Sequence, residues 1–286
     1  MSVYKRSFQR YQGPPTPLWS RFLILPRYAY EQILRSRFFF GLLLLCFAYP
    51  VFCIGHIYLQ HNLAAIKAFN IDLDKLLPVD ASFFLRFMYV QTGWCFLVTV
   101  IFGPGLISPD LANNGLILYL CRPFSRIDYV LGKLSILLLP LSLISWVPGL
   151  LVFFLQGYFE GAGWTVGNWR FAVSLFTGVA FYIMTLALLS MAISAWVKWK
   201  MVAGAILLGG PLVLKGFGAA INKIFDVEWG YLLDFGELFQ SVWQSLIGAR
   251  HSSPLGTTDA VGAILVVLAL SLYLLGRKIK PCEVVA

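Results

Sequence analysis

The stretch FMYVQTGWCFLVTVIFGPGLI, residues 87–107, contains no charged side chain. An α-helix rises about 1.5 Å per residue, so about 20 apolar residues cross the roughly 30 Å hydrocarbon core of a bilayer. Residues 134–158 form a second uncharged stretch of this kind. In the whole chain of 286 residues, 59% are hydrophobic and only 12% are charged. Because soluble domains have about a quarter of their residues charged, the sequence predicts an all-α integral membrane protein.

Six stretches are apolar enough to be transmembrane helices, and the last is the shortest: Phe38–Leu59, Phe87–Ile107, Leu134–Tyr158, Phe171–Trp196, Met201–Ile221 and Ala260–Leu275. We expect one six-span domain over residues 38–275, an N-terminal segment over 1–37 and a basic tail over 276–286. Residues 1–37 hold seven Lys and Arg residues and no short apolar run with a cleavage site, so we expect no cleavable signal peptide.

The Lys and Arg residues indicate the orientation. Residues 1–37, 108–133, 197–200 and 276–286 hold 15 of the 22 Lys and Arg residues and only four acidic residues. Since cytoplasmic loops carry an excess of Lys and Arg, we expect these segments and both termini in the cytoplasm. Such charge also favours contact with anionic membrane lipids. It is spread over short segments without interleaved aromatic residues, so we expect no nucleic-acid partner.

Two further segments are amphipathic. Residues 18–37 follow the stiff linker GPPTP, and Pro26 suits the first turn of a helix that we expect to lie in the membrane interface. Residues 231–246 repeat apolar side chains at steps of about three and four residues. This pattern predicts an outer amphipathic helix before the sixth span, either flat on the surface or re-entrant.

The segment between the second and third spans reads SPDLANNGLILYLCRPFSRIDYVLGK, residues 108–133. Ser108 is a suitable helix N-cap, with Asp110 in the first turn. Pro123 ends this helix, and Ser125 with Asp128 forms a capping-box pattern that starts the next one. The residues therefore predict a short helix, a corner and a second helix. An ordinary polar hairpin and a rigid cytoplasmic protrusion both remain open on this pattern alone.

This segment resembles the signature stretch of ABC-2-type transporter permeases. That family shows an acidic residue after the second span, a leucine-rich helix, an Arg-Pro-x-x-Arg corner, and a helix opening into Gly-Lys. The matching positions are Asp110, Gly115–Leu120, Arg122, Pro123, Arg126, Gly132 and Lys133. The six spans and both amphipathic segments also fit. The chain departs from the family at SPDLANNG, where neutral Asn113 and Asn114 replace a second acidic residue, which implies a weaker contact or a different partner surface.

The resemblance implies the permease subunit of an ABC transporter, most simply an exporter in a bacterial inner membrane. Two copies would pair as a homodimer, and each would press a coupling helix into a separate cytoplasmic ATPase. The residues that this assigns to coupling are Asp110, Asn113, Asn114, Arg122, Pro123, Arg126, Asp128 and Lys133. The chain contains no GxxxxGK[ST] phosphate loop, so ATP and Mg would be bound by the partner ATPase, and we expect no cofactor in this chain.

No enzyme motif is present: the sequence has no HExxH, no GxSxG and no paired carboxylates within a span. His56 and His61 are five positions apart, which is a poor spacing for two metal ligands on one helix, so we expect no metal site. The alternative to a transporter is a non-transporting membrane scaffold or a lipid-modifying enzyme, with residues 231–246 as a docking surface.

Lys215 is an ionisable residue within the fifth predicted span. It is near the outer end, where its side chain can reach the interface, but an intramembrane charge is also a candidate functional residue. Gly209, Gly210 and Pro211 would loosen or kink the same helix. We therefore hypothesise that a broken fifth span, with these four residues, lines the substrate route.

Overall fold

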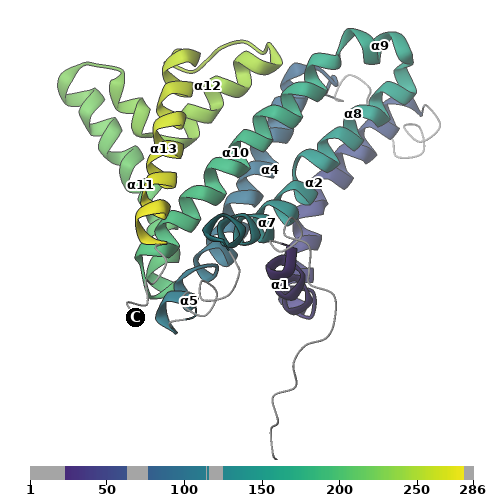
Figure 1. Cartoon of the computed structure of the whole chain (residues 1–286). Helices are drawn as coiled ribbons and strands as arrows, with labels where there is room; N and C mark the ends of the chain where they lie inside the picture. The colour runs from purple at the N-terminus through teal and green to yellow at the C-terminus, as the bar shows by residue number, and fades with distance from the viewer. Residues whose placement is uncertain (1–22, 63–76, 114, 116–124, 280–286) are drawn as a thin grey trace, which may run out of the picture.

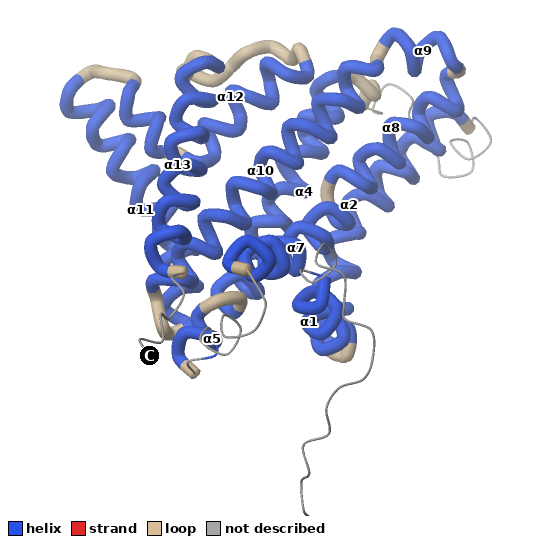
Figure 2. Tube along the Cα trace, viewed as in Figure 1, coloured by secondary structure: helices blue, strands red, loops and turns tan. Residues whose placement is uncertain are grey.

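The computed structural model describes residues 23–62, 77–113, 115 and 125–279. Within these ranges the chain is helical and contains no strand, which confirms the all-α prediction. Six helical stretches are long and apolar enough to cross a membrane. Figure 1 shows α1, α5 and the end of α13 at one end of the molecule, which we call the basic end. The opposite end, which we call the far end, carries α9 and α12 (Figures 1 and 2).

The elements follow one another as α1 (Ile24–Leu34), α2 (Arg37–His61), α4 (Ala81–Phe102), the 3₁₀ turn η3 (Gly103–Gly105), α5 (Ser108–Ala112), α7 (Arg126–Ile144), α8 (Trp146–Glu160), α9 (Ala162–Gly167), α10 (Trp169–Trp196), α11 (Lys200–Phe225), the 3₁₀ turn η4 (Trp229–Leu233), α12 (Phe235–Ile247) and α13 (Thr257–Lys278). The first, fourth, fifth and sixth predicted spans lie within single helices, whereas the second, Phe87–Ile107, runs past the end of α4 through η3. The sixth is longer than its apolar stretch, because α13 continues through polar residues at both ends.

The third span is two helices rather than the single helix predicted over Leu134–Tyr158. The backbone leaves the helical region at Ser145, with φ −116° and ψ −92°, between α7 and α8. Figure 1 looks nearly along the axis of α7, whereas α8 lies in the plane of the picture, so the two helices meet at a sharp bend. The physical reason is Pro148, whose ring cannot donate to the carbonyl of Ile144 and clashes with it in a straight helix.

Gln91 compensates for two prolines at once. Its side chain is fully buried in α4, and its amide nitrogen donates to the carbonyl oxygens of Cys46, at 3.3 Å, and Ile144. Each carbonyl precedes a proline by four residues, Pro50 in α2 and Pro148 in α8, so neither has its helical N–H partner. Because an unpaired carbonyl is costly in an apolar interior, Gln91 stabilises α2 and the α7–α8 bend together.

The N-terminal amphipathic helix ends at Leu34, before the predicted end, and packs on the bundle, while residues 18–22 lie outside the described residues. α1 begins at Ile24 and contacts α7 and α2. Its Tyr30 hydroxyl is 2.8 Å from the carbonyl oxygen of Ser135 and 2.9 Å from that of Ile136. Burial raises the pKa of Tyr30, so the hydroxyl keeps its proton and remains a donor. The location of α1 in a membrane interface stays a prediction.

The amphipathic segment predicted over residues 231–246 is bent rather than one helix. It divides at Asp234 into η4 and α12, and the Asp234 carboxylate caps α12 by accepting from the N–H groups of Gly236, at 2.9 Å, and Glu237. The apolar face of α12 packs on α10, where the indole N–H of Trp243 donates to the carbonyl of Gly178 at 3.1 Å. An amphipathic helix is thus confirmed over Phe235–Ile247, with its apolar face inside the bundle, whereas its position on the outer side of the membrane stays a prediction.

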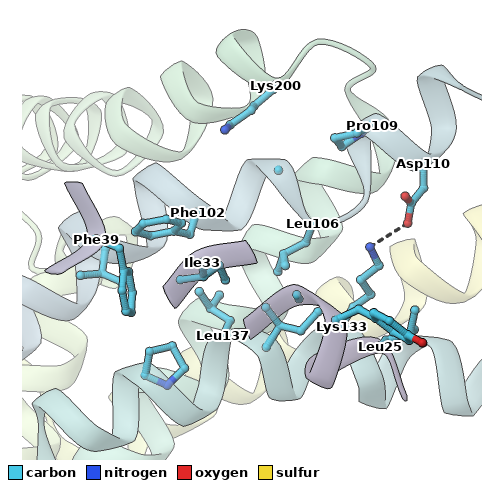
Figure 3. A pocket seen from close by; sticks show the side chains of 16 residues that line it. Leu25, Ile33, Phe39, Phe102, Leu106, Pro109, Asp110, Lys133, Leu137 and Lys200 are labelled. Carbon is cyan, nitrogen blue, oxygen red and sulfur yellow. Dashed lines mark ion pairs between the residues drawn. The ribbon is translucent and has the colours of Figure 1, made fainter. Parts of the chain in front are cut away.

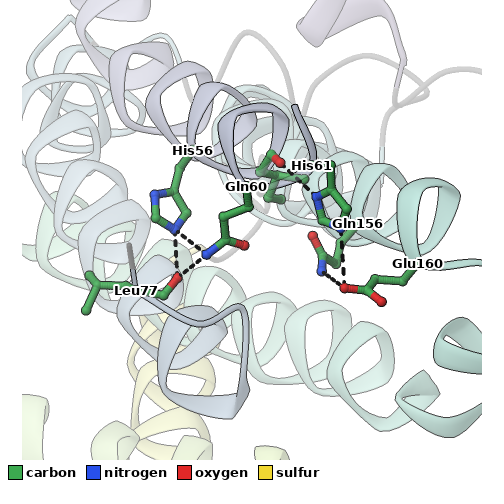
Figure 4. A network of polar contacts seen from close by, with 7 residues as sticks. His56, Gln60, His61, Leu77, Gln156 and Glu160 are labelled. Carbon is green, nitrogen blue, oxygen red and sulfur yellow. Dashed lines mark hydrogen bonds and ion pairs between the residues drawn. The ribbon is translucent and has the colours of Figure 1, made fainter. Parts of the chain in front are cut away.

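A polar network at the far end joins α2 to its neighbours (Figure 4). His56 is 2.8 Å from the carbonyl oxygen of Leu77, which precedes α4. His61 is 3.3 Å from the carboxylate of Glu160 at the end of α8, which also accepts from Gln156 at 3.5 Å. Among the residues of known placement, no three His, Cys, Asp or Glu side chains group as metal ligands would. The two histidines therefore connect helices here.

Candidate coupling site

The start of α5 is fixed to the end of α10 by hydrogen bonds of two buried serines, Ser108 and Ser194. Ser194 accepts hydrogen bonds through its hydroxyl from the N–H groups of Ile107, at 3.1 Å, and Ser108, at 2.9 Å. The Ser108 hydroxyl donates to the carbonyl of Val197 at 2.7 Å, and both serines are fully buried. The chain approaches closely because Gly103 lacks a side chain: a Cβ there would lie 2.0 Å from the hydroxyl oxygen of Ser190.

The predicted N-cap role of Ser108 is wrong. α5 has Ile107 at its N-cap position, and no side chain caps it. The Ser108 hydroxyl bonds instead to the carbonyls of Ser194 and Val197 at the end of α10, because these carbonyls lack helical partners. Asp110 does lie in the first turn of α5, as predicted.

Asp110 links α5 to α7. Its carboxylate is 2.8 Å from the ammonium nitrogen of Lys133 and accepts a hydrogen bond from the hydroxyl of Tyr129 at 2.7 Å. The Lys133 and Asp110 side chains are only 12% and 18% exposed. Charge-assisted bonds shielded from water are the stronger ones, so this contact fixes the helices on both sides of residues 113–125 to each other.

Neither the role of Tyr129 nor the pairing of Asp110 with Lys133 was predicted from the sequence. The spacing of Tyr129 and Lys133 does indicate that their side chains lie close together, because residues four apart share one helix face. Both side chains point to the same partner, and the Lys133 ammonium also lies 5.6 Å from the centre of the Tyr129 ring. The partner itself is on another helix, and no local pattern identifies it.

The start of α7 is as predicted. The Ser125 hydroxyl accepts from the N–H of Asp128 at 3.1 Å, and the Asp128 carboxylate accepts from the N–H of Ser125 at 3.1 Å, which completes a capping box. Arg126 follows it and is exposed, as is Asn113 at the end of α5. Asn114, Arg122 and Pro123 lie outside the described residues, so the corner itself stays a prediction.

Of the four residues predicted to line the substrate route, two line a cavity and two do not. Pro211 and Lys215 line a cavity of about 520 Å³ between α4, α10, α11 and α12, whereas Gly209 and Gly210 do not line it. The expected break in the fifth span is absent, since α11 is one continuous helix. A transmembrane helix tolerates such a Gly-Gly-Pro sequence without losing its regular backbone. Lys215 forms an ion pair with Asp234, the cap of α12, at 3.0 Å.

The described residues thus form two candidate sites. One is the junction of α5, α7 and α10 at the basic end, and the other is the cavity beside α11 toward the far end. Comparisons with known proteins do not add a family to these features, because no protein-family model matches the sequence and no curated protein matches it.

Proposed function

We propose that this chain is the membrane-spanning permease subunit of an ABC transporter. It pairs with a second copy and with a separate cytoplasmic ATPase, which binds ATP and Mg, and it exports a substrate across a bacterial inner membrane. The observation that carries the proposal is the Asp110–Lys133 pair, because it fixes the two helices that flank residues 113–125. Six candidate spans and the resemblance of residues 107–133 to ABC-2-type permeases support it.

The contacts of the described residues suit such a coupling role. A push on the segment between α5 and α7 acts on both helices together, because Asp110 joins them. It also acts on α10, because Ser108 bonds to the last carbonyls of that helix. Packed helices with two arrangements pass a local displacement on as rigid-body movement. In this proposal both termini and this junction face the cytoplasm.

The cavity beside Pro211 is the proposed substrate route. Its walls include the aromatic rings of Tyr182, Phe239 and Trp243, and its few charged groups include Lys215. Mostly apolar walls with a small number of polar groups are typical of sites for small molecules, and its volume of about 520 Å³ is within their usual range. We therefore propose a small amphipathic substrate.

Charge reversal at the corner tests the coupling. We expect Arg122→Glu with Arg126→Glu to release the proposed partner ATPase in co-purification, or to abolish its stimulation by the permease. Reversal of Arg250, an exposed arginine beyond the end of α12, is the matched control and should change neither. If the corner variant retains the ATPase and an unchanged rate of ATP hydrolysis, the proposed role of this segment is wrong.

The orientation has its own test. In a background without the native cysteines, Ser125→Cys should react with a membrane-impermeant maleimide only after the cells are permeabilised. Ser245→Cys, exposed on α12 at the far end, should react in intact cells. The reverse labelling pattern would invert the topology and remove the case for cytoplasmic coupling.

Two neighbouring substitutions test the substrate route. Leu212 lines the cavity and Val213 does not, although their side chains are similarly exposed, at 66% and 70%. Leu212→Trp should lower uptake of a fluorescent amphipathic probe into inverted vesicles several-fold, and Val213→Trp should leave uptake near the unsubstituted rate. Equal uptake by both variants would contradict this route while leaving the coupling proposal intact.

A further inference from the structure

A second cavity, of about 540 Å³, lies at the basic end between α1, α2, α4, α5, α7 and α11 (Figure 3). Most of its walls are apolar, and they include Leu25, Ile33, Phe39, Phe102, Leu106 and Leu137. Two ammonium groups also line it, those of Lys133 and Lys200. Figure 3 shows these lysines entering from different helices, with Leu106 between them in this view.

The charges that line this cavity do not balance. Asp110 is the one carboxylate among its described lining residues, and its oxygens already receive the Lys133 ammonium and the Tyr129 hydroxyl. Lys200 forms no ion pair with any residue whose position is described. Its side chain lies along η3, so that a Cβ on Gly105 would be 3.4 Å from its terminal carbon. Among the described lining residues, one positive charge is therefore uncompensated.

The backbone adds to this positive potential. Lys200 is the first residue of α11, and the Trp199 side chain at the N-cap position accepts no hydrogen bond from the helix. The first N–H groups of a helix have no intrahelical acceptor and carry a partial positive charge. An anion near the Lys200 ammonium therefore meets two sources of attraction that the described protein groups do not neutralise.

We propose that this cavity binds the phosphate of an anionic phospholipid, with part of an acyl chain along the apolar wall. A free anion would leave that wall in contact with water, whereas a phospholipid supplies both the charge and the apolar surface. The cavity lies at the end where Lys and Arg gather, and basic pockets between membrane helices on the cytoplasmic side suit such headgroups. The proposal requires a membrane protein and is independent of the transporter assignment.

Native mass spectrometry of the full chain in detergent tests it, with equal amounts of dioleoyl phosphatidylglycerol and phosphatidylcholine. We expect one retained phosphatidylglycerol, and about fivefold weaker retention in Lys200→Gln, since one lysine near a lipid headgroup contributes about that factor. Lys198→Gln is the matched control, because Lys198 is exposed in the same turn and does not line the cavity. It should retain the lipid as the unsubstituted chain does.

A second substitution separates the cavity from charge alone. Ala29 lines the apolar wall, so Ala29→Phe should lower retention of phosphatidylglycerol while Lys200 remains in place. Equal retention of the two lipids, or equal effects of Lys200→Gln and Lys198→Gln, would overturn the proposal. Displacement of the lipid by millimolar inorganic phosphate would assign the site to a free anion and overturn it as well.

Discussion

The hydroxyl of Tyr30 donates to the carbonyl of Ile136, at 2.9 Å. Pro140 has no N–H with which to complete the helical bond to that carbonyl, so α1 supplies the donor that α7 lacks. We expect Tyr30→Phe to lower the free energy of unfolding by about 1–2 kcal/mol, because the carbonyl becomes unpaired. Thermal unfolding in detergent measures this. Tyr28→Phe is the control, since Tyr28 is 66% exposed, and an equal effect would contradict the role of Tyr30.

Gln91→Met removes the donor to two carbonyls that prolines leave free. We expect a loss of roughly 1–3 kcal/mol in the free energy of unfolding, since side-chain volume is kept and only the hydrogen bonds are lost. Gln156→Met is a suitable comparison: Gln156 is also buried, but within the described part of the chain its amide nitrogen hydrogen-bonds only to Glu160, at 3.5 Å on its own helix. A smaller effect at Gln91 than at Gln156 would show that the bend does not depend on Gln91.

The Asp110–Lys133 pair should show energetic coupling. In a double-mutant cycle of Asp110→Asn and Lys133→Met, we expect an interaction of about 1–3 kcal/mol, measured by thermal unfolding, because both side chains are largely shielded. The pair of Glu31 and Arg35 has a similar distance of 2.9 Å but is 59% and 79% exposed, so its cycle should give less than about 0.5 kcal/mol. Equal coupling in the two cycles would remove the argument from burial.

Gly218 and Gly209 should respond to alanine in opposite directions. A Cβ on Gly218 would lie 2.2 Å from the carbonyl oxygen of Gly230, whereas nothing lies within 4 Å of one on Gly209. We expect Gly218→Ala to destabilise the contact between α11 and η4 by about 1–3 kcal/mol. Gly209→Ala should stabilise the helix by up to about 1 kcal/mol. Thermal unfolding of both variants checks the signs, and stabilisation by Gly218→Ala would contradict the close contact.

The features that depend on neighbouring residues alone could be predicted from the sequence. The apolar stretches predicted six candidate spans, because burial of a whole helix surface in lipid requires no detailed partner. The capping box of Ser125 and Asp128 was predictable since its donors and acceptors lie within four residues. The amphipathic face of α12 was visible in the same way.

The features that could not be predicted depend on contacts between residues far apart in the sequence. Ser108 has the chemistry of an N-cap, yet it bonds to Ser194 and Val197, and its choice depends on where α10 ends. To predict the bend at Ser145, one would need to know that Gln91 donates a hydrogen bond to the carbonyl of Ile144, which Pro148 leaves without a helical partner. A glutamine inside an apolar stretch does indicate a hydrogen bond between helices, because a polar group within a candidate span must find a partner. Its partners, however, lie on other helices.

The bend at Ser145 divides the third candidate span into two helices, α7 and α8, that point in different directions. A straight helix that rotates about its own axis leaves its opposite tip in place. Here α7 and α8 point in different directions, so a small rotation of α7 about its axis sweeps the tip of α8 through an arc (Figure 1). In the proposed transporter, a rotation of α7 near Lys133 would therefore displace Glu160, at the end of α8, sideways.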